Sequence, residues 1–453
     1  IVALETRLAE LHWTRLQNRD RQKIYANQLS FAQAQAAVPG IDLAVWFRGY
    51  GAPQPEKLVV AQDTYFANLG EVIRATPLTT WRAYLKFHLL KLLAPYLTEE
   101  IVALNFEFQG KELRGQTEQP ERWRRGVRFV NLSAGELLGQ LYVRAHFSQQ
   151  AKQEVAMLVE NLREAFAESI QALPWMGAAT KQQALVKLEK FLPKLGYPDE
   201  WRDFSDLKTA PDDLAGNFIR AREFARDYNL KILAEPVDRS RWTTYPHMVN
   251  AFYRPTHNAI TFPAGILQLP MFASGRDPAM NYGAIGSIIG HEFSHGFDDQ
   301  GRKFDGDGLL RNWWTEEDAA EYRRRAEVLE KQFAAFQPLP DTAIDGKLTL
   351  GENIGDLAGL LMAYKAFELS GHADGPQLGG FTPRQRFFIS YAIAWRTKIR
   401  PQYLRELLLR DTHSPAEYRV MGILPNVPGF YRAFDVNADD GMYLAPEQRA
   451  KIW

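Results

Sequence analysis

The chain has 453 residues, of which 54 are Lys or Arg and 54 are Asp or Glu, so its formal net charge is zero. A balanced charge without a long basic run argues against nucleic acid or an anionic membrane as the main partner. Hydrophobic residues make up 46% of the chain, enough to build a large core, and the length suggests about two or three domains. No stretch approaches the ~20 consecutive apolar residues that a membrane span needs, and the absence of cysteine excludes disulfides and thiolate metal ligands.

Apolar residues at helical spacing fill the first part of the chain, residues 1–210, and predict a mostly helical domain. The pattern begins at Ile1, so we expect the chain to start inside a helix and an upstream segment of the same polypeptide to be missing. A turn-rich stretch over 197–213 predicts the linker to a second domain, residues 211–453.

Three helices can be placed in the first domain. Thr79 or Thr80 is the predicted N-terminal cap of a helix that ends near Pro95. A second helix is predicted over 148–173, and a third follows it to about residue 191.

Beyond the linker the pattern changes to that of strands. The runs 248–253 and 259–262 are rich in β-branched and aromatic residues and flank the turn-forming stretch 255–258, which predicts a β-hairpin. Helical patterns return after Asp356 to about residue 369, over about 384–399, and after Pro415.

The motif His291-Glu292-Phe293-Ser294-His295 decides the chemistry. Residues four apart share one face of a helix, so His291 and His295 can both direct a ring nitrogen at one metal ion. The competing interpretation is a solvated helix face that carries these residues by chance. The apolar run before His291 instead predicts a buried helix, where two unpartnered histidines would be costly and a metal ion would remove that cost.

A catalytic zinc takes three protein ligands and keeps one position open, and Glu352 offers the third ligand. Zinc lowers the pKa of a bound water from about 15.7 to roughly 7, and Glu292 is the expected general base. Asp356, four residues after Glu352 on a predicted helix, can accept the outer N–H of a ligating histidine. An ordinary helix carboxylate is the alternative for Asp356. We therefore expect one Zn²⁺ per chain.

Two further features are weaker on the residues alone. Asp411 can keep His413 protonated, and a protonated histidine can stabilise the oxyanion that develops during amide hydrolysis. A loop histidine is, however, more often incidental. Asn250 and Ala251 on the hairpin can bind an extended peptide by strand addition, although Asn250 also suits a turn or an edge.

These motifs stand in an order that resembles the neprilysin-type zinc metallopeptidases, which include neprilysin, the endothelin-converting enzymes and bacterial oligopeptidases. The match spans nearly the whole chain and is densest after about residue 240. Its landmarks are Pro174-Trp175-Met176, Val249 to Tyr253, Phe262 to Gln268, His291 to Gln300, Gly351 to Asp356, His413-Ser414-Pro415 and the terminal Trp453.

The resemblance implies a role for each matching residue. His291, His295 and Glu352 correspond to the zinc ligands and Glu292 to the general base. Asp356 corresponds to the family's second essential acid, described either as a proton donor or as support for a zinc-bound histidine.

His413 resembles the family's transition-state histidine, oriented by Asp411. Arg419 matches the arginine that hydrogen-bonds the substrate backbone, and Asn250 with Ala251 matches the substrate-binding edge. The family lines an apolar pocket for the side chain after the scissile bond at the positions of Ile266, Met271, Ile288, Ala394 and Trp395.

The family fold is mainly α (α+β). The resemblance implies a thermolysin-like catalytic domain with a small β-hairpin or sheet at 211–453, and part of a helical cap domain at 1–210. Together they would enclose a central chamber that admits short peptides and excludes folded proteins. Ala450 stands where animal members carry a cysteine, which favours a bacterial origin. Because bacterial members of the family are often exported, the resemblance implies a location in the periplasm or cell envelope rather than in the cytoplasm.

The metal-binding motif predicts a zinc hydrolase, and the resemblance implies an endopeptidase that cleaves oligopeptides on the amino side of hydrophobic residues. The contrasting hypothesis is a catalytically inert peptide-binding or scaffold protein that keeps zinc as a structural pin. A third, another His-Glu-x-x-His hydrolase such as an aminopeptidase, fits less well. Its third ligand usually follows the second histidine much sooner than Glu352 follows His295.

Overall fold

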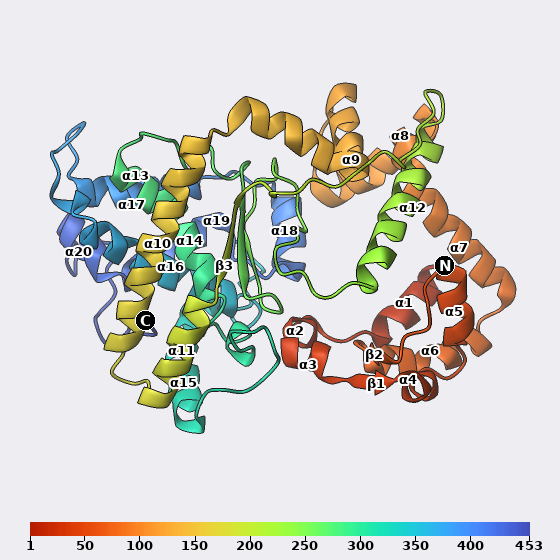
Figure 1. The fold of residues 1–453 in the computed structure, drawn as a ribbon, viewed down its shortest axis with the longest axis horizontal. Coiled ribbons are helices and arrows are strands. Elements are labelled where there is room, and N and C mark those ends of the chain that lie inside the picture. The colour runs from red at the N-terminus through yellow and green to blue at the C-terminus, as the bar shows by residue number, and fades with distance from the viewer. The chain divides into compact units, whose positions relative to one another are not determined.

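The computed structural model describes all residues from 1 to 453, which form two compact units that alternate along the sequence (Figure 1). Unit 1 contains residues 1–129 and 203–237, and unit 2 contains residues 130–202 and 238–453. Both units are mainly helical, as expected, and each contains a small sheet. The functional division of the chain at residue 210 stays a prediction.

Unit 1 has a small core in which Leu4 and Leu8 pack with Leu69 and Val72. The amphipathic helix expected at the start of the chain is therefore confirmed. Its helices are α1 (Val2–Leu11), α2 (Arg15–Arg19), α3 (Arg21–Ala26), α4 (Phe31–Ala37), α5 (Leu43–Tyr50), α6 (Asp63–Ala75), α7 (Leu78–Leu93), α8 (Glu99–Phe106) and α12 (Leu214–Leu233). Helix α9 (Arg122–His146) runs from unit 1 into unit 2.

Two details of unit 1 differ from the sequence prediction. Helix α7 starts at Leu78 directly after Pro77, so Thr79 and Thr80 lie in its first turn and the predicted cap is wrong. Proline presets the backbone for a helix start without a side-chain cap. A short antiparallel pair, β1 (Gln28–Ser30) and β2 (Lys57–Val59), was also missed, because three residues are too few to show alternation.

Unit 2 holds the large core of the protein. Its longest predicted helix is confirmed as α10 (Gln149–Ala172), capped by Ser148, which accepts a hydrogen bond from the Ala151 amide. The other helices are α11 (Ala178–Glu189), α13 (Pro278–Asn281), α14 (Ser287–Ser294), α15 (Glu316–Ala334), α16 (Leu350–Leu369), α17 (Pro383–Ala394), α18 (Pro401–Arg410), α19 (Ala416–Met421) and α20 (Pro428–Phe434).

The predicted helix over 384–399 ends earlier than expected. Helix α17 stops at Ala394, and α18 begins only at Pro401. Arg400 directly precedes Pro401 and is extended, because the residue before a proline is disfavoured in the helical region, so α17 cannot continue into α18.

The sheet of unit 2 has the strand order β3-β5-β4. Strands β4 (Phe252–Arg254) and β5 (Ala259–Pro263) are antiparallel, which confirms the hairpin. Strand β3 (Leu192–Gly196) pairs in parallel with β5 and was missed, because Pro193 and Lys194 interrupt its apolar pattern. Strand β4 therefore lies at an edge of the sheet.

Helices α14 and α16 cross at very short range, and α10 packs against both of them (Figure 1). Glycines make the crossing possible. A Cβ atom on Gly359 would lie 2.4 Å from the Ser287 carbonyl oxygen and 2.5 Å from the backbone nitrogen of His291. A Cβ atom on Gly290 would lie 2.7 Å from the Gly359 carbonyl oxygen. Backbone thus meets backbone at the point where both helices carry the predicted metal ligands.

No helix in the structure combines the length and the apolar character needed to span a bilayer.

Replacing Gly359 with Ala is expected to lower the free energy of unfolding by about 1–3 kcal/mol, because the added methyl group separates two packed backbones. Thermal unfolding measures the change. Gly126 is the matched control, since its Cβ would meet nothing within 4 Å and Gly126→Ala should leave stability unchanged or raise it. Equal stability of the two variants would contradict the close crossing.

Candidate active site

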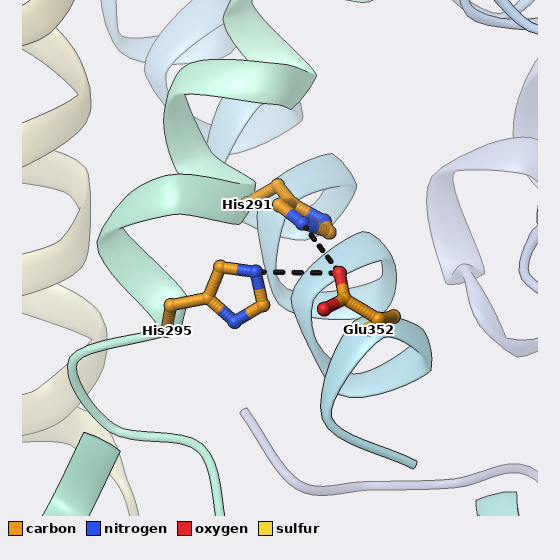
Figure 2. A group of neighbouring side chains, drawn as sticks. All are labelled: His291, His295 and Glu352. Carbon is orange, nitrogen blue, oxygen red and sulfur yellow. Dashed lines mark ion pairs between the residues drawn. The ribbon is translucent and has the colours of Figure 1, made fainter. Parts of the chain in front are cut away.

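His291, His295 and Glu352 converge at the crossing of α14 and α16 (Figure 2). The Oε2 atom of Glu352 lies 3.2 Å from Nε2 of His291 and 3.4 Å from Nε2 of His295. The potential ligand atoms of all three residues lie within 4.8 Å of one another. The helical spacing therefore brings the two imidazoles together, as the sequence predicted.

This arrangement fits a zinc ion. Ligand atoms placed about 2.0–2.1 Å from a tetrahedral zinc lie roughly 3.3 Å from one another, close to the separations above. The Oε2 atom of Glu352 is buried and has no hydrogen-bond partner, as expected of an atom reserved for a cation. Two imidazoles and one carboxylate form a typical catalytic zinc set, whereas magnesium and calcium prefer oxygen ligands alone.

A second carboxylate stands behind each histidine. Asp356 Oδ1 lies 2.9 Å from Nδ1 of His291, the contact that the sequence predicted. Asp298 Oδ2 lies 2.8 Å from Nδ1 of His295. A carboxylate that accepts the Nδ1–H fixes the tautomer and leaves Nε2 free to bind the metal.

Sequence reasoning missed Asp298. It lies beyond the end of α14, where helical spacing no longer fixes the direction of a side chain. The available signal was its position three residues after His295, inside the motif from His291 to Gln300.

The charges around the ligands favour a cation. Burial lowers the pKa of His295, but Glu352 and Asp298 outweigh it and raise that pKa well above the usual value. Burial also lowers the pKa of His291, and its hydrogen bond to Asp356 together with the nearby Glu352 carboxylate reverses the effect. Burial raises the pKa of Glu352, yet the neighbouring histidines hold it well below the usual value. The site stabilises positive charge near the Glu352 carboxylate.

Glu292 differs from the other acids of the site. It is buried, its Oε2 atom has no hydrogen-bond partner, and burial raises its pKa while His291 and His295 partly oppose the shift. A carboxylate with a raised pKa and an unused oxygen is suited to take up a proton.

Arg419 is engaged inside the protein. Its Nε and Nη2 atoms donate to the two carboxylate oxygens of Asp356 at 2.7 and 2.6 Å. Its guanidinium lies 3.7 Å above the ring of Trp395, and its carbonyl accepts a bond from the Tyr391 hydroxyl. Asp356 thus bridges Arg419 and His291, and a contact of Arg419 with substrate stays a prediction.

His413 also reaches the metal ligands. Its Nε2 atom lies 3.2 Å from Oε2 of Glu352, and its Nδ1 lies 2.8 Å from Oδ1 of Asp411. Burial lowers the pKa of His413, but Glu352 and Asp411 outweigh it and raise that pKa to about 10, which favours the protonated ring. The side chain remains 48% exposed and therefore accessible from solvent.

The expected substrate-binding residues occupy different surroundings. Asn250 is exposed and Ala251 is buried directly before the edge strand β4. Ile266, Ile288 and Ala394 are buried, while Met271 and Trp395 are partly buried. Ile288 lies on α14, and Trp395 reaches the site through Arg419. A common pocket for the five apolar residues stays a prediction.

Replacing Asp298 with Ala is expected to weaken zinc binding roughly 10–100-fold, because His295 loses the acceptor that orients its ring. Titration of the zinc-loaded protein with a chelator measures the affinity. Asp299→Ala is the control, because it removes the neighbouring carboxylate. The Oδ2 atom of Asp299 accepts a hydrogen bond from the side-chain amide of Gln300 at 2.7 Å. Indistinguishable zinc affinities of the two variants would contradict the role of Asp298.

Known proteins resemble this chain in sequence along most of its length. Two profiles of peptidase family M13 match the sequence, one over residues 1–198 and one over residues 250–450. Neprilysin-2 of Drosophila melanogaster is 33% identical, with 99% of this chain and 61% of that protein covered. Neutral endopeptidase of Lactobacillus helveticus is also 33% identical, with 94% and 64% covered. The chain spans about three-fifths of the length of these relatives.

Two solved structures match along all of this chain. The crystal structure of the Mycobacterium tuberculosis zinc metalloprotease Zmp1 in complex with an inhibitor is 43% identical, with a TM-score of 0.96 and 70% of that chain covered. The crystal structure of PepO from Lactobacillus rhamnosis is 32% identical, with a TM-score of 0.90 and 70% covered. These matches confirm the resemblance seen in the motifs, and the chain belongs to peptidase family M13.

Proposed function

We propose that this chain carries the catalytic site of a zinc-dependent endopeptidase that hydrolyses oligopeptides. One observation supports this most strongly: two imidazoles and a carboxylate converge beside Glu292, a buried acid with an unused oxygen. A structural zinc site usually closes its fourth position with another protein ligand. The contrasting scaffold hypothesis gives no reason to bury Glu292 with an unused carboxylate oxygen.

Each residue of the site has a proposed role in hydrolysis. A zinc ion held by His291, His295 and Glu352 would supply Lewis-acid chemistry, which polarises the scissile carbonyl and activates water. Glu292 takes a proton from the attacking water and passes it to the leaving amine. We assign His413 the role of donor to the developing oxyanion. Losing one such donor typically costs roughly 3–4 kcal/mol.

The asymmetry of the acids supports these assignments. Asp356 is bound by Arg419 and His291, and although burial raises its pKa, these partners lower it overall. It therefore stays ionised and orients His291. Glu292 has the opposite shift, so the proton transfers fall to Glu292 and not to Asp356.

Substrate recognition is proposed to combine an edge strand with an apolar pocket. Asn250 and Ala251 precede the edge strand β4, where an extended peptide can add its backbone hydrogen bonds. The five apolar positions given above would receive the side chain after the scissile bond. A location outside the cytoplasm stays a prediction from the family.

Substituting Glu292 with Gln is expected to lower kcat by at least about 10²–10⁴-fold with zinc still bound, because the amide cannot accept the proton. Hydrolysis of an internally quenched peptide and metal analysis measure the two quantities. Glu447→Gln, at an exposed position far along the chain, is the control. Near wild-type turnover of Glu292→Gln with zinc bound would remove the mechanism, and a zinc-loaded but inert wild-type protein would favour the scaffold.

Peptides that differ only in the residue after the scissile bond test the pocket. We expect kcat/KM to fall about 10–100-fold when Phe or Leu is replaced by Ala, because less apolar surface is buried. Acidic residues should be poorer still. Equal cleavage across the series would contradict an apolar pocket at Ile266, Met271, Ile288, Ala394 and Trp395.

A further inference from the structure

Lys187, on α11, is a buried lysine outside the metal ligands. The residue is only 1% exposed. Its Nζ atom donates hydrogen bonds to the carbonyl oxygens of Gly296, Gly301 and Phe304 at 2.6, 2.8 and 2.7 Å. An ammonium group has three donors, so all of them are used by one segment of the chain. That segment, residues 296–304, follows His295 directly.

Burying this ammonium group is costly, and its surroundings offset the cost. Charge-assisted bonds to three carbonyl oxygens replace the lost water. The rings of Phe297, Tyr253 and Trp313 lie 5.6, 5.8 and 5.8 Å from Nζ, which adds cation–π attraction. Removing the amine would leave three buried carbonyl oxygens without that donor, so the course of the segment depends on it.

The segment held by Lys187 carries Asp298. One oxygen of Asp298 accepts the amides of Gln300 and Gly301 at 2.8 and 2.6 Å, and the other contacts His295. Gly301 is therefore fixed on both sides, through its N–H to Asp298 and through its carbonyl to Lys187. The position of the Asp298 carboxylate is set by this turn.

A further hydrogen bond fixes the backbone of Lys187 itself. The side-chain amide of Asn258, a fully buried residue in the hairpin turn, donates to the carbonyls of Lys187 and Gly306 at 3.0 and 3.1 Å. Burial lowers the pKa of Lys187 to about 7, while Asp298 and Asp305 oppose the shift, so the ammonium form with its three donors prevails below about pH 7. The hairpin and α11 are thereby joined to the segment behind the metal site.

We infer that Lys187 is a positioning residue of the metal site: its ammonium group holds the 296–304 segment, which places Asp298 and so aims His295 at the ion. Lys187 donates its hydrogen bonds to the backbone of residues 296–304 and not to the metal ligands, so it acts through Asp298. The inference rests on the zinc site proposed above.

The test compares zinc affinities of the folded proteins by chelator titration, without substrate. Lys187→Met keeps the length and apolar stem but removes the donors, and the zinc dissociation constant is expected to rise about 10–100-fold. Lys194→Met is the matched control, since Lys194 is also buried at 8% exposure and donates to a single carbonyl, that of Arg241, at 2.9 Å. Its zinc affinity should stay within about twofold of wild type.

A double-mutant cycle separates positioning from general loss of structure. In an Asp298→Ala background, Lys187→Met should change zinc affinity less than about twofold, because the proposed route is already broken. A full further loss in that background, or an unchanged affinity in Lys187→Met alone, would overturn the inference. If Lys187→Met does not fold, Lys187→Gln, which retains two donors, should show an intermediate loss, and wild-type affinity there would overturn it.

These outcomes are distinct from a failure of the proposed function. A wild-type protein that binds no zinc would contradict the metal site itself. Zinc binding by the wild type with an unaffected Lys187→Met variant would contradict only the role of Lys187.

Discussion

The close crossing of α14 and α16 is the constraint on which the rest of the site depends. Two histidines on one helix can share a metal ion only if the third ligand arrives from another element at the same depth. Gly290 and Gly359 let the two backbones touch, and a Cβ atom on Gly355 would lie 2.7 Å from Nδ1 of His291. The glycines therefore allow both the close helix packing and the metal site. The space that a Cβ atom would fill is occupied by the facing backbone and by the imidazole ring of His291.

Around this crossing the protein arranges buried charge in layers. The inner layer is two imidazoles and Glu352, and the next consists of Asp356 and Asp298, which accept from the outer ring nitrogens. Cations then hold these acids in place, Arg419 directly at Asp356 and Lys187 through the turn that carries Asp298. Glu292 differs from Asp356 and Asp298, because one of its buried oxygens has no hydrogen-bond partner and its pKa is raised. That difference is what distinguishes a reacting centre from a structural ion pair.

The inner layer and Asp356 could be predicted from the sequence because helical periodicity fixes the directions of side chains. His291 and His295 are four residues apart in one helical motif, and Glu352 and Asp356 are four residues apart on another helix. Periodicity says nothing once a helix ends, which is why Asp298 and Lys187 were missed: both act through a turn whose path is set by tertiary contacts. Strand β3 was missed for a related reason, since a parallel partner from a distant segment, β5, defines it. Long amphipathic helices such as α10 were placed correctly because their pattern is local.

The central claim is that one zinc ion binds where His291, His295 and Glu352 meet. Anomalous X-ray diffraction at the zinc absorption edge, on crystals of the zinc-loaded protein, tests it most directly. The account predicts a single strong peak within bonding distance of Nε2 of both histidines and a carboxylate oxygen of Glu352, absent in a His291→Ala, His295→Ala variant. A peak elsewhere in the molecule, or none at this position in fully loaded protein, would contradict it.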